Sequence, residues 1–290
     1  MTSPLHAPYY ADRAVQTAAR VIENVRIARD THRLRFACAE MARRILPGQF
    51  LMLRLAGVND PLIGRPLALY DTVPDSSGEP AAIDVVYLVK GKFTSRLATY
   101  LPGQVLDVWG PLGNGFEPRP AEQLIMVAGG IGQTPFVAVA QEVLGRRRYG
   151  APARECSPVK RVTLCYGARS ADLFAGLDDF ERAGVDVRLA TDDDSRGHKG
   201  FVTEILKRVL AETDPSRQIV ACGPEPMLEA VAKIALAERV PCQVSLETPM
   251  ACGVGICFTC VAKVRDASGE WDYKRTCVEG PVFDAHALEW

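Results

Sequence analysis

Four cysteines near the C-terminus have the residue type and spacing of iron ligands. Cys252, Cys257 and Cys260 follow the pattern C-x4-C-x2-C, and Cys277 stands alone further along the chain. This is the ligand spacing of a plant-type [2Fe-2S] cluster, which exchanges one electron at a time. A structural zinc site or a disulfide is the alternative, but structural zinc usually takes two close pairs of ligands, whereas here three cysteines crowd one loop. The spacing therefore favours a [2Fe-2S] cluster.

The loop that carries three of these cysteines also contains Gly253 and Gly255. Glycine adopts backbone conformations that larger residues avoid, so we expect the loop to curl tightly with its amide groups facing the sulfur atoms. The other five cysteines lie mostly in apolar stretches. We expect them to be reduced thiols of a cytoplasmic protein, with Cys156 the most exposed of them.

The composition indicates a globular protein of two or three domains. The chain has 290 residues, of which 48% are hydrophobic, and this length exceeds that of a typical single domain. A formal net charge of −1 gives no reason to expect nucleic acid or an anionic membrane as a partner. The N-terminus lacks a secretory pattern, and no run of about 18 apolar residues occurs. We expect a soluble protein that is not secreted.

Residues 15–118 predict an antiparallel β-barrel of about six strands. Alternating apolar segments separated by turn sequences occur at 33–38, 50–55 and 83–89. The spacing of the apolar residues between Lys92 and Leu101 predicts one short helix, which we expect to begin at the hydroxyl residue Thr94 or Ser95.

Residues 119–240 predict an α/β domain, and residues 241–290 a small module that carries the four cysteines. A buried strand near 124–128 runs into a glycine-rich turn. Helices and strands then alternate, as is typical of a parallel sheet that binds a nucleotide. The expected helices span 135–144, 173–183, 202–210 and 227–237, and the expected strands span 162–166, 185–189 and 218–222.

Three segments of the predicted barrel contain residues that could bind a phosphate-containing ligand. Arg65 lies beside Pro66 on an extended strand and could pair with a phosphate. Gly91 and Lys92 lie at the start of the short helix, whose amide groups could bind a pyrophosphate. The third segment follows the last barrel strand and contains Gly110, Gly113, Asn114 and Gly115.

The glycine-rich turn of the α/β domain has a strand before it and a helix after it, which makes it a candidate for dinucleotide binding. Its open backbone would let a pyrophosphate approach the helix N-terminus. Two later strand ends, at 166–169 and 221–227, should lie at the same edge of the sheet. The candidate residues of the turn are Gly129, Gly130, Ile131, Gly132, Thr134 and Pro135.

These segments and the cysteine loop resemble the ferredoxin reductase-like superfamily, and most closely the electron-transfer subunits of class 1B dihydroorotate dehydrogenases. The resemblance covers nearly the whole chain. It implies that two segments bind FAD, although Ala68 replaces the family's hydroxyl residue and Phe93 replaces its second glycine. These segments are Arg65, Pro66, Leu67 and Ala68, and Gly91, Lys92, Phe93 and Thr94.

The same resemblance implies that NAD(H) binds at the glycine-rich turn. Cys222, followed by Gly223 and Pro224 in the motif C-G-P-x-x-M, would then lie near the nicotinamide C4 and the flavin N5, and a small core cysteine is the alternative. Asp192 follows another strand end, where a carboxylate would hydrogen-bond a ribose and repel a 2′-phosphate. This favours NADH over NADPH, although basic neighbours could pair with a phosphate instead.

A hydride carries two electrons and the cluster accepts one, whereas a flavin exchanges either number. We therefore predict an oxidoreductase subunit that passes electrons between NAD(H), FAD and the [2Fe-2S] cluster. The three predicted parts of this chain leave no room for an additional β/α barrel, a fold of about 250 residues. The resemblance accordingly implies an FMN-containing dihydroorotate dehydrogenase catalytic subunit as the partner, in a heterotetramer with two copies of each chain that acts in pyrimidine biosynthesis.

The apolar residues Ile256 and Phe258 in the cysteine loop either dock that partner or pack over the cluster. Three other functions remain open. The chain could be the reductase of another iron–sulfur or oxygenase partner, or a subunit of a sulfhydrogenase or of a ferredoxin-dependent transhydrogenase. It could also be a redox sensor without turnover.

Overall fold

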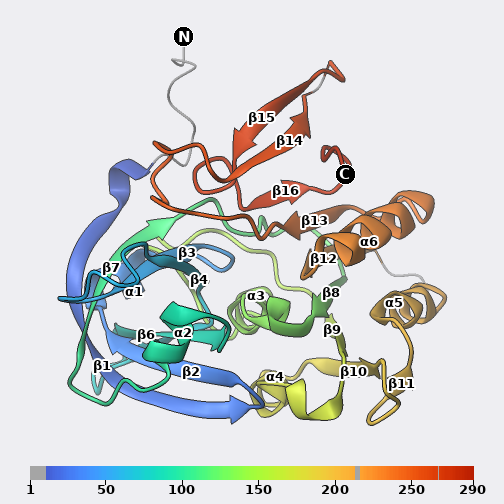
Figure 1. The fold of residues 1–290 in the computed structure, drawn as a ribbon. Helices are drawn as coiled ribbons and strands as arrows, with labels where there is room; N and C mark the ends of the chain where they lie inside the picture. Colours follow the sequence, from blue (N-terminus) through green and yellow to red (C-terminus); the bar gives the residue numbers. More distant parts are fainter. Residues whose placement is uncertain (1–10, 213–215, 267) are drawn as a thin grey trace.

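The computed structural model describes residues 11–212, 216–266 and 268–290, so the N-terminal stretch 1–10 considered above lies outside it. After a short 3-10 helix at Ala11–Arg13, the first part of the chain forms one curved antiparallel sheet (Figure 1). It has seven strands in the order β4-β3-β7-β1-β2-β6-β5. Their bounds are β1 Val15–Ala28, β2 Thr31–Ala37, β3 Phe50–Leu55, β4 Arg65–Ala68, β5 Asp71–Pro74, β6 Pro80–Leu88 and β7 Val105–Leu112.

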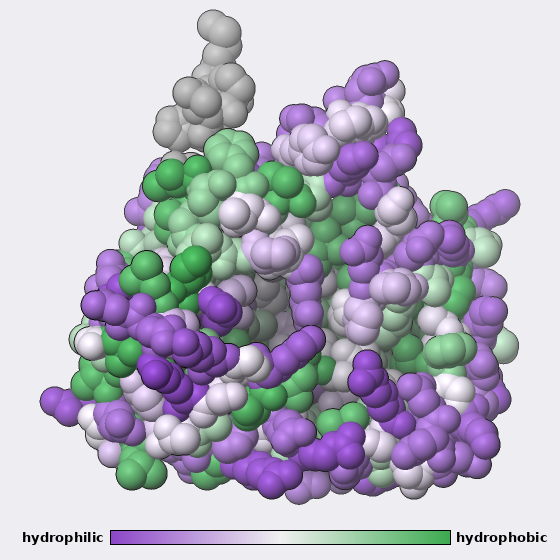
Figure 2. Space-filling view, in the orientation of Figure 1, coloured by the Kyte–Doolittle hydropathy of each residue, from purple (hydrophilic) through white to green (hydrophobic). Residues whose placement is uncertain are grey.

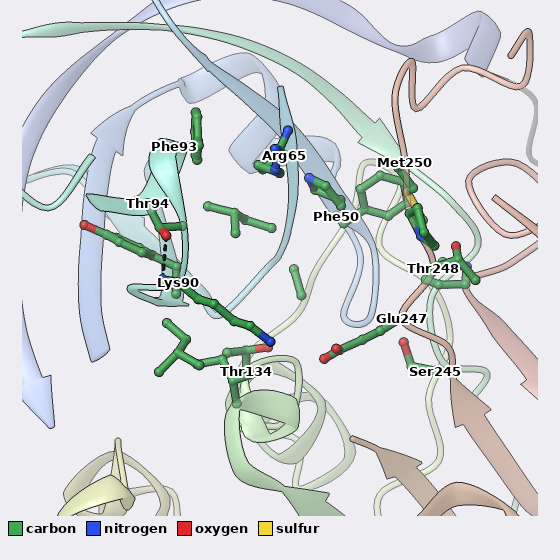
Figure 3. Close-up of a pocket in the computed structure, with 18 of the residues that line it drawn as sticks. Phe50, Arg65, Lys90, Phe93, Thr94, Thr134, Ser245, Glu247, Thr248 and Met250 are labelled. Carbon is green, nitrogen blue, oxygen red and sulfur yellow. Dashed lines mark hydrogen bonds between the residues drawn. The ribbon is translucent and has the colours of Figure 1, made fainter. Parts of the chain in front are cut away.

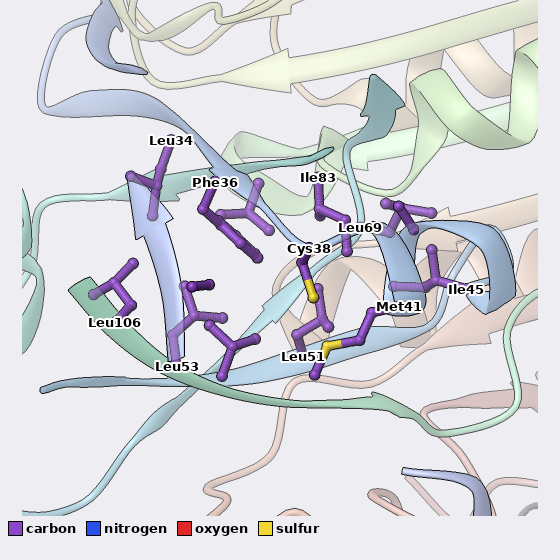
Figure 4. Packing of buried hydrophobic residues seen from close by; sticks show 14 of the residues in the cluster. Leu34, Phe36, Cys38, Met41, Ile45, Leu51, Leu53, Leu69, Ile83 and Leu106 are labelled. Carbon is purple, nitrogen blue, oxygen red and sulfur yellow. The ribbon is translucent and has the colours of Figure 1, made fainter. Parts of the chain in front are cut away.

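The seven strands agree with the expectation of about six, although β4 and β5 have only four residues each and are too short to show a clear alternation. Longer strands do show it: in β7 every second side chain is buried. The inward side chains form an apolar core (Figure 4), to which Leu34, Leu53 and Ile83 contribute. Helix α1 (Ala39–Arg44), which was not predicted, closes one end of this core with Met41.

Helix α2 spans Lys92–Leu97 and places Phe93 and Leu97 in the same core. The expectation that this helix begins at Thr94 or Ser95 is wrong, because Gly91 precedes its first residue. The Thr94 hydroxyl instead accepts a hydrogen bond from the backbone N–H of Lys90, at 2.7 Å. Gly91 has a φ of +87°, a conformation that glycine adopts without strain.

The second part of the chain is a seven-stranded sheet with helices on both faces. The strand order is β11-β10-β9-β8-β12-β13-β16, and all neighbours are parallel except β13 and β16. The strands are β8 Gln123–Gly129, β9 Arg161–Ala168, β10 Asp186–Thr191, β11 His198–Lys199, β12 Arg217–Cys222, β13 Cys242–Ser245 and β16 Val282–Asp284. The helices are α3 Phe136–Val143, α4 Leu177–Arg182, α5 Val202–Leu210 and α6 Glu225–Ala237.

One predicted helix, 173–183, is divided in the structure. A short 3-10 helix at Ala171–Leu173 precedes α4, and Gly176 between them has a φ of +73°. A left-handed residue ends regular helical hydrogen bonding, so the two pieces cannot form one helix. The part of the chain that the structure describes has no helix with the length and apolar character needed to cross a membrane.

The C-terminal segment is built into the second sheet. Its strands β13 and β16 form the edge next to β12, and the cysteine loop and the hairpin of β14 (Val261–Arg265) and β15 (Trp271–Arg275) lie between them in sequence. The cysteine loop reaches the barrel, where the indole N–H of Trp109 donates a hydrogen bond to the Cys252 carbonyl at 2.9 Å. The three parts of the chain therefore meet around one region (Figure 1).

Candidate functional site

A cavity of about 660 Å³ lies where the barrel, the α/β sheet and the cysteine loop meet. Figure 2 shows the molecule hollowed between the barrel and the α/β domain, and Figure 3 shows the side chains that line the cavity. Many residues predicted to bind FAD or NAD(H) line this one space, although they come from distant parts of the chain. They are Arg65, Pro66, Leu67, Ala68, Gly91, Lys92, Phe93, Thr94, Ile131, Thr134, Pro135 and Cys222.

The barrel side of the cavity combines open backbone with positive charge. A side chain at Gly91 would meet no atom within 4 Å, so a ligand can approach the start of α2 closely. Arg65 donates hydrogen bonds to the carbonyls of Ile63 and Gly64, both at 3.0 Å, which hold its guanidinium at the rim. Lys92 also lines the cavity and pairs with Asp60. Two cations beside free amide groups suit the phosphates of a dinucleotide.

The glycine-rich turn reaches the cavity from the α/β side through a short 3-10 helix, Gly130–Gln133. A Cβ at Gly132 would lie 2.2 Å from the Cys222 carbonyl oxygen, so only glycine lets this turn approach the end of β12. Gly129 is similarly packed, since a Cβ there would lie 2.7 Å from Pro224. Gly130 differs, because a side chain there would meet nothing within 4 Å. This open position faces space that a ligand could fill.

Cys222 ends β12 and borders the cavity with only 6% of its surface exposed. Its thiol lies close to Ser245, the residue paired with it on β13. Burial raises the pKa of the Cys222 thiol far above its ordinary value. The group is therefore a neutral thiol at physiological pH, which can contact a ligand without adding charge.

Other predicted binding residues do not line the cavity. The Asn114 side chain donates to the Val282 carbonyl at 2.7 Å and accepts from the Val282 N–H at 3.1 Å. A Cβ at Gly113 would lie 2.5 Å from Pro281. This segment, which also contains Gly110 and Gly115, therefore positions the C-terminal segment against the barrel. Gly223 and Pro224 likewise pack against the glycine-rich turn.

Asp192 lies at the carboxyl end of β10, exposed and outside the cavity lining. The two aspartates after it have partners, because Asp193 accepts hydrogen bonds from Ser195 and Asp194 pairs with Lys199. Asp192 has no such side-chain partner among the described residues. Its carboxylate is thus available to a ligand that extends along the strand ends.

The four cysteines lie in two pairs. Cys257 lies close to Cys252, and Cys260 lies close to Cys277. Within the described residues, no group of three cysteine, histidine or acidic side chains has the arrangement that one metal ion requires. Two neighbouring pairs of cysteines suit a two-iron cluster, in which each iron would take two thiolates.

The surroundings of the cysteines also fit a cluster. The Val254 N–H donates to the Cys252 sulfur at 3.4 Å, and Cys257 Sγ lies 3.1 Å from Thr259 Oγ1. Such donors stabilise negative charge on cluster sulfur atoms. Gly253 and Gly255 have φ values of +73° and +82°, which agrees with the expected tight curl. The four cysteines thus have the donor set and the shell that a [2Fe-2S] cluster needs.

Several residues of the cavity wall could not be recognised from the sequence. Lys90 follows β6, and Glu247 and Thr248 follow β13, so their place depends on how distant strands meet. No local motif marks them. Met250 and Ala251 also line the cavity and directly precede Cys252, so the cavity borders the cysteine loop.

Three family models match the chain. Residues 18–116 match an oxidoreductase FAD-binding domain, and residues 126–233 match an oxidoreductase NAD-binding domain. Residues 247–289 match the iron-sulfur cluster binding domain of dihydroorotate dehydrogenase B. These matches cover the barrel, the α/β sheet and the cysteine module in turn, so the chain has domains for FAD, NAD and an iron–sulfur cluster.

Relatives match nearly the whole chain. A protein named dihydroorotate dehydrogenase B (NAD(+)), electron transfer subunit, from Caldanaerobacter subterraneus subsp. tengcongensis is 34% identical over 93% of this chain and 97% of its own length. A protein of the same name from Geobacillus kaustophilus is 37% identical over 89% and 93%. A solved structure described as an NADH-dependent reduced ferredoxin-NADP oxidoreductase matches with a TM-score of 0.77 and 28% identity, over 94% of this chain and 90% of that one. With this identity, coverage and domain order, the chain belongs to the family of dihydroorotate dehydrogenase B electron transfer subunits.

Proposed function

We propose that this chain carries electrons between NAD(H) and an FMN-containing dihydroorotate dehydrogenase catalytic subunit, through FAD and a [2Fe-2S] cluster. The observation that carries the proposal is the shared cavity. Its wall combines the FAD segments of the barrel, the glycine-rich turn and the residues that precede Cys252. A two-electron donor and a one-electron acceptor can both reach a flavin held there.

The residues have distinct roles in this proposal. Arg65 and the start of α2 bind the phosphates of FAD, while Gly130 and Thr134 receive the nicotinamide dinucleotide. Cys222 contacts the nicotinamide, and Asp192 binds a ribose and disfavours the 2′-phosphate of NADPH. Cys252, Cys257, Cys260 and Cys277 hold the cluster. When bound, the flavin supplies the exchange between hydride and single electrons.

The partner binds at an apolar surface around the cluster. Ile256 and Phe258 are 72% and 62% exposed, and Arg275 lies over the Phe258 ring. Leu62 and Ile63, also exposed, line a second cavity that includes Cys252. Figure 2 shows apolar side chains gathered where the cysteine loop meets the barrel. An exposed patch of this kind is typical of a protein interface. We propose a cytoplasmic heterotetramer with two copies of each chain.

Anaerobic purification of the native complex tests this function. We expect about two iron atoms and one FAD per chain, a second polypeptide that contains FMN, and rapid bleaching of the flavin by NADH. Reduction of the catalytic subunit by dihydroorotate should then reduce the cluster and the FAD. Zinc in place of iron, or an NADH-resistant flavin, would contradict the proposal.

The structural match to a ferredoxin-NADP oxidoreductase favours one second candidate, a subunit of a ferredoxin-dependent transhydrogenase. The two candidates differ in their partner. If this candidate applies, the isolated complex should couple reduced ferredoxin to pyridine nucleotide turnover and should not respond to dihydroorotate.

A further inference from the structure

One wall of the large cavity contains a carboxylate to which neither the sequence motifs nor the proposed binding roles assign a task. Glu247 lies two residues beyond Ser245, the last residue of β13, and Ser245 pairs with Cys222 at the end of β12. The Glu247 side chain therefore stands beside the thiol proposed to contact the nicotinamide. In Figure 3 the Lys90 side chain extends across the cavity toward Glu247.

Glu247 is the one carboxylate among the described residues that line this cavity, whereas Arg65, Lys90 and Lys92 are cations. The carboxylate opens onto the cavity, so it is exposed, but protein surrounds it on its other sides. Burial raises the pKa of the Glu247 carboxyl, and the Lys90 ammonium lowers it by a smaller amount. Ligands that fill the cavity would displace water and strengthen the effect of burial.

We propose that Glu247 accepts the proton that is left in the cavity when both electrons of a hydride leave through the cluster. A hydride from NADH brings one proton and two electrons. The iron–sulfur cluster takes the electrons one at a time and takes no proton. One proton per hydride must therefore leave, and it binds a Glu247 carboxylate oxygen before it passes to water. When electrons flow in the opposite direction, Glu247 returns the proton.

The other titratable groups that line the cavity cannot take this proton. Burial raises the pKa of the Cys222 thiol, which is therefore already protonated. Burial also raises the pKa of the Tyr87 hydroxyl, which donates to Asn24 at 3.0 Å. The three cations carry their protons at neutral pH. This leaves Glu247 as the acceptor. The nearby Lys90 ammonium favours the ionised carboxylate of Glu247 between turnovers.

The inference rests on FAD and NAD(H) occupying this cavity, and Glu247→Gln tests it in the full chain purified with FAD and cluster. The variant keeps the side-chain shape and removes the proton acceptor. NADH-reduced protein is mixed with a one-electron acceptor, and re-oxidation of cluster and flavin is followed separately. We expect flavin re-oxidation to slow by about 10-fold or more and to lose its solvent deuterium isotope effect, while cluster re-oxidation changes little.

Two further measurements separate a proton acceptor from a merely structural residue. The infrared difference spectrum of the native protein should contain the band of a protonated carboxylic acid, which Glu247→Gln should abolish. Glu238→Gln removes an exposed charge beyond the end of α6 and should keep both the band and the rate. Glu247→Asp should restore part of the isotope effect.

The possible outcomes are distinct. A native protein without FAD, or one whose flavin NADH does not reduce, would contradict the proposed function itself. The role of Glu247 alone would be overturned by a different result. In that case the native protein works as proposed, and the Glu247→Gln variant keeps the native re-oxidation rate, isotope effect and carboxylic acid band.

Discussion

The indole N–H of Trp109 on β7 donates a hydrogen bond to the carbonyl oxygen of Cys252, at 2.9 Å. This contact joins the barrel to the first residue of the cysteine motif, 143 positions further along the chain. A Cβ at Gly253 would lie 2.6 Å from Met52 on β3, so the loop also packs tightly on the barrel. The position of the cluster relative to the barrel is thus set within this chain.

Replacing Trp109 with phenylalanine should loosen this attachment. The variant loses one hydrogen bond to a partly buried carbonyl, which is worth about 1 kcal/mol in the free energy of unfolding. We expect a lower iron content after purification and slower electron transfer from flavin to cluster, measured by metal analysis and rapid mixing. Trp271→Phe, on the exposed hairpin, is the matched control and should change neither quantity.

Replacing Gly132 with alanine should disrupt the junction of β8 and β12. The added Cβ would lie 2.2 Å from the Cys222 carbonyl oxygen, and overpacking of this kind costs about 1–3 kcal/mol in the free energy of unfolding. Thermal unfolding should show a lower Tm. Gly130→Ala meets no neighbouring atom, but the φ of +54° at this position strains any residue other than glycine by about 1 kcal/mol, so we expect a moderate loss of stability there while NADH binding weakens. Equal Tm values for native protein and Gly132→Ala would contradict this packing role.

The rate of flavin reduction by NADH should not depend on ionisation of the Cys222 thiol. Burial raises the pKa of this thiol, so it stays neutral from about pH 6 to pH 9, where an ordinary exposed thiol begins to ionise. Cys222→Ser retains a small neutral group and should show the same pH profile as native protein. A pH transition near 8 that disappears in Cys222→Ser would show that the thiol does ionise.

Removing the Asp192 carboxylate should reduce the preference for NADH. Asp192→Asn no longer repels a 2′-phosphate, and we expect the ratio of kcat/KM for NADPH to that for NADH to rise by about 10-fold, as one lost like-charge contact allows. Asp194→Asn is the matched control, since Asp194 pairs with Lys199. If the ratio changed equally in the two variants, the preference would depend on the total charge of the loop and not on Asp192.

Charge in the apolar surface of the cysteine loop should weaken assembly with the catalytic subunit. Ile256→Asp and Phe258→Asp should each cost about 2 kcal/mol in binding free energy if they lie at the centre of the interface. Leu236→Asp alters an equally exposed apolar residue on α6, away from the cysteine loop, and should leave the affinity unchanged. Titration calorimetry with the catalytic subunit measures these differences, and native affinity in both loop variants would exclude this surface.

The sequence predicted those parts of the molecule whose local pattern is strong. Helix α5 matches its predicted span, 202–210, because its apolar residues follow the helical period closely, and β3 likewise matches 50–55. The cysteine spacing identified a cluster site because ligand spacing is itself a local property. The predicted helix 173–183 was wrong because it ran through Gly176, a residue that weakens a helix interior and here adopts a φ of +73°.

The parts that the sequence did not predict depend on contacts between distant strands. Glu247 reaches the cavity because β13 lies beside β12, and Lys90 reaches it because β6 ends near the α/β sheet. Asn114 was expected to bind a phosphate-containing ligand, but its amide is hydrogen-bonded to the backbone of Val282. Because glycine has no side chain, either a ligand or another segment of the chain can come close to the backbone of a glycine-rich segment. Only the structure shows which of the two does so.

The insertion of the cysteine segment between β13 and β16 has a practical consequence for engineering. These strands are hydrogen-bonded to each other, and β13 also pairs with β12 of the nucleotide-binding sheet. The segment is therefore fastened at both of its ends to the edge of that sheet. It cannot be cut out and transplanted as an independent ferredoxin without exposing that edge, and a host reductase would have to supply two matching strands to receive it.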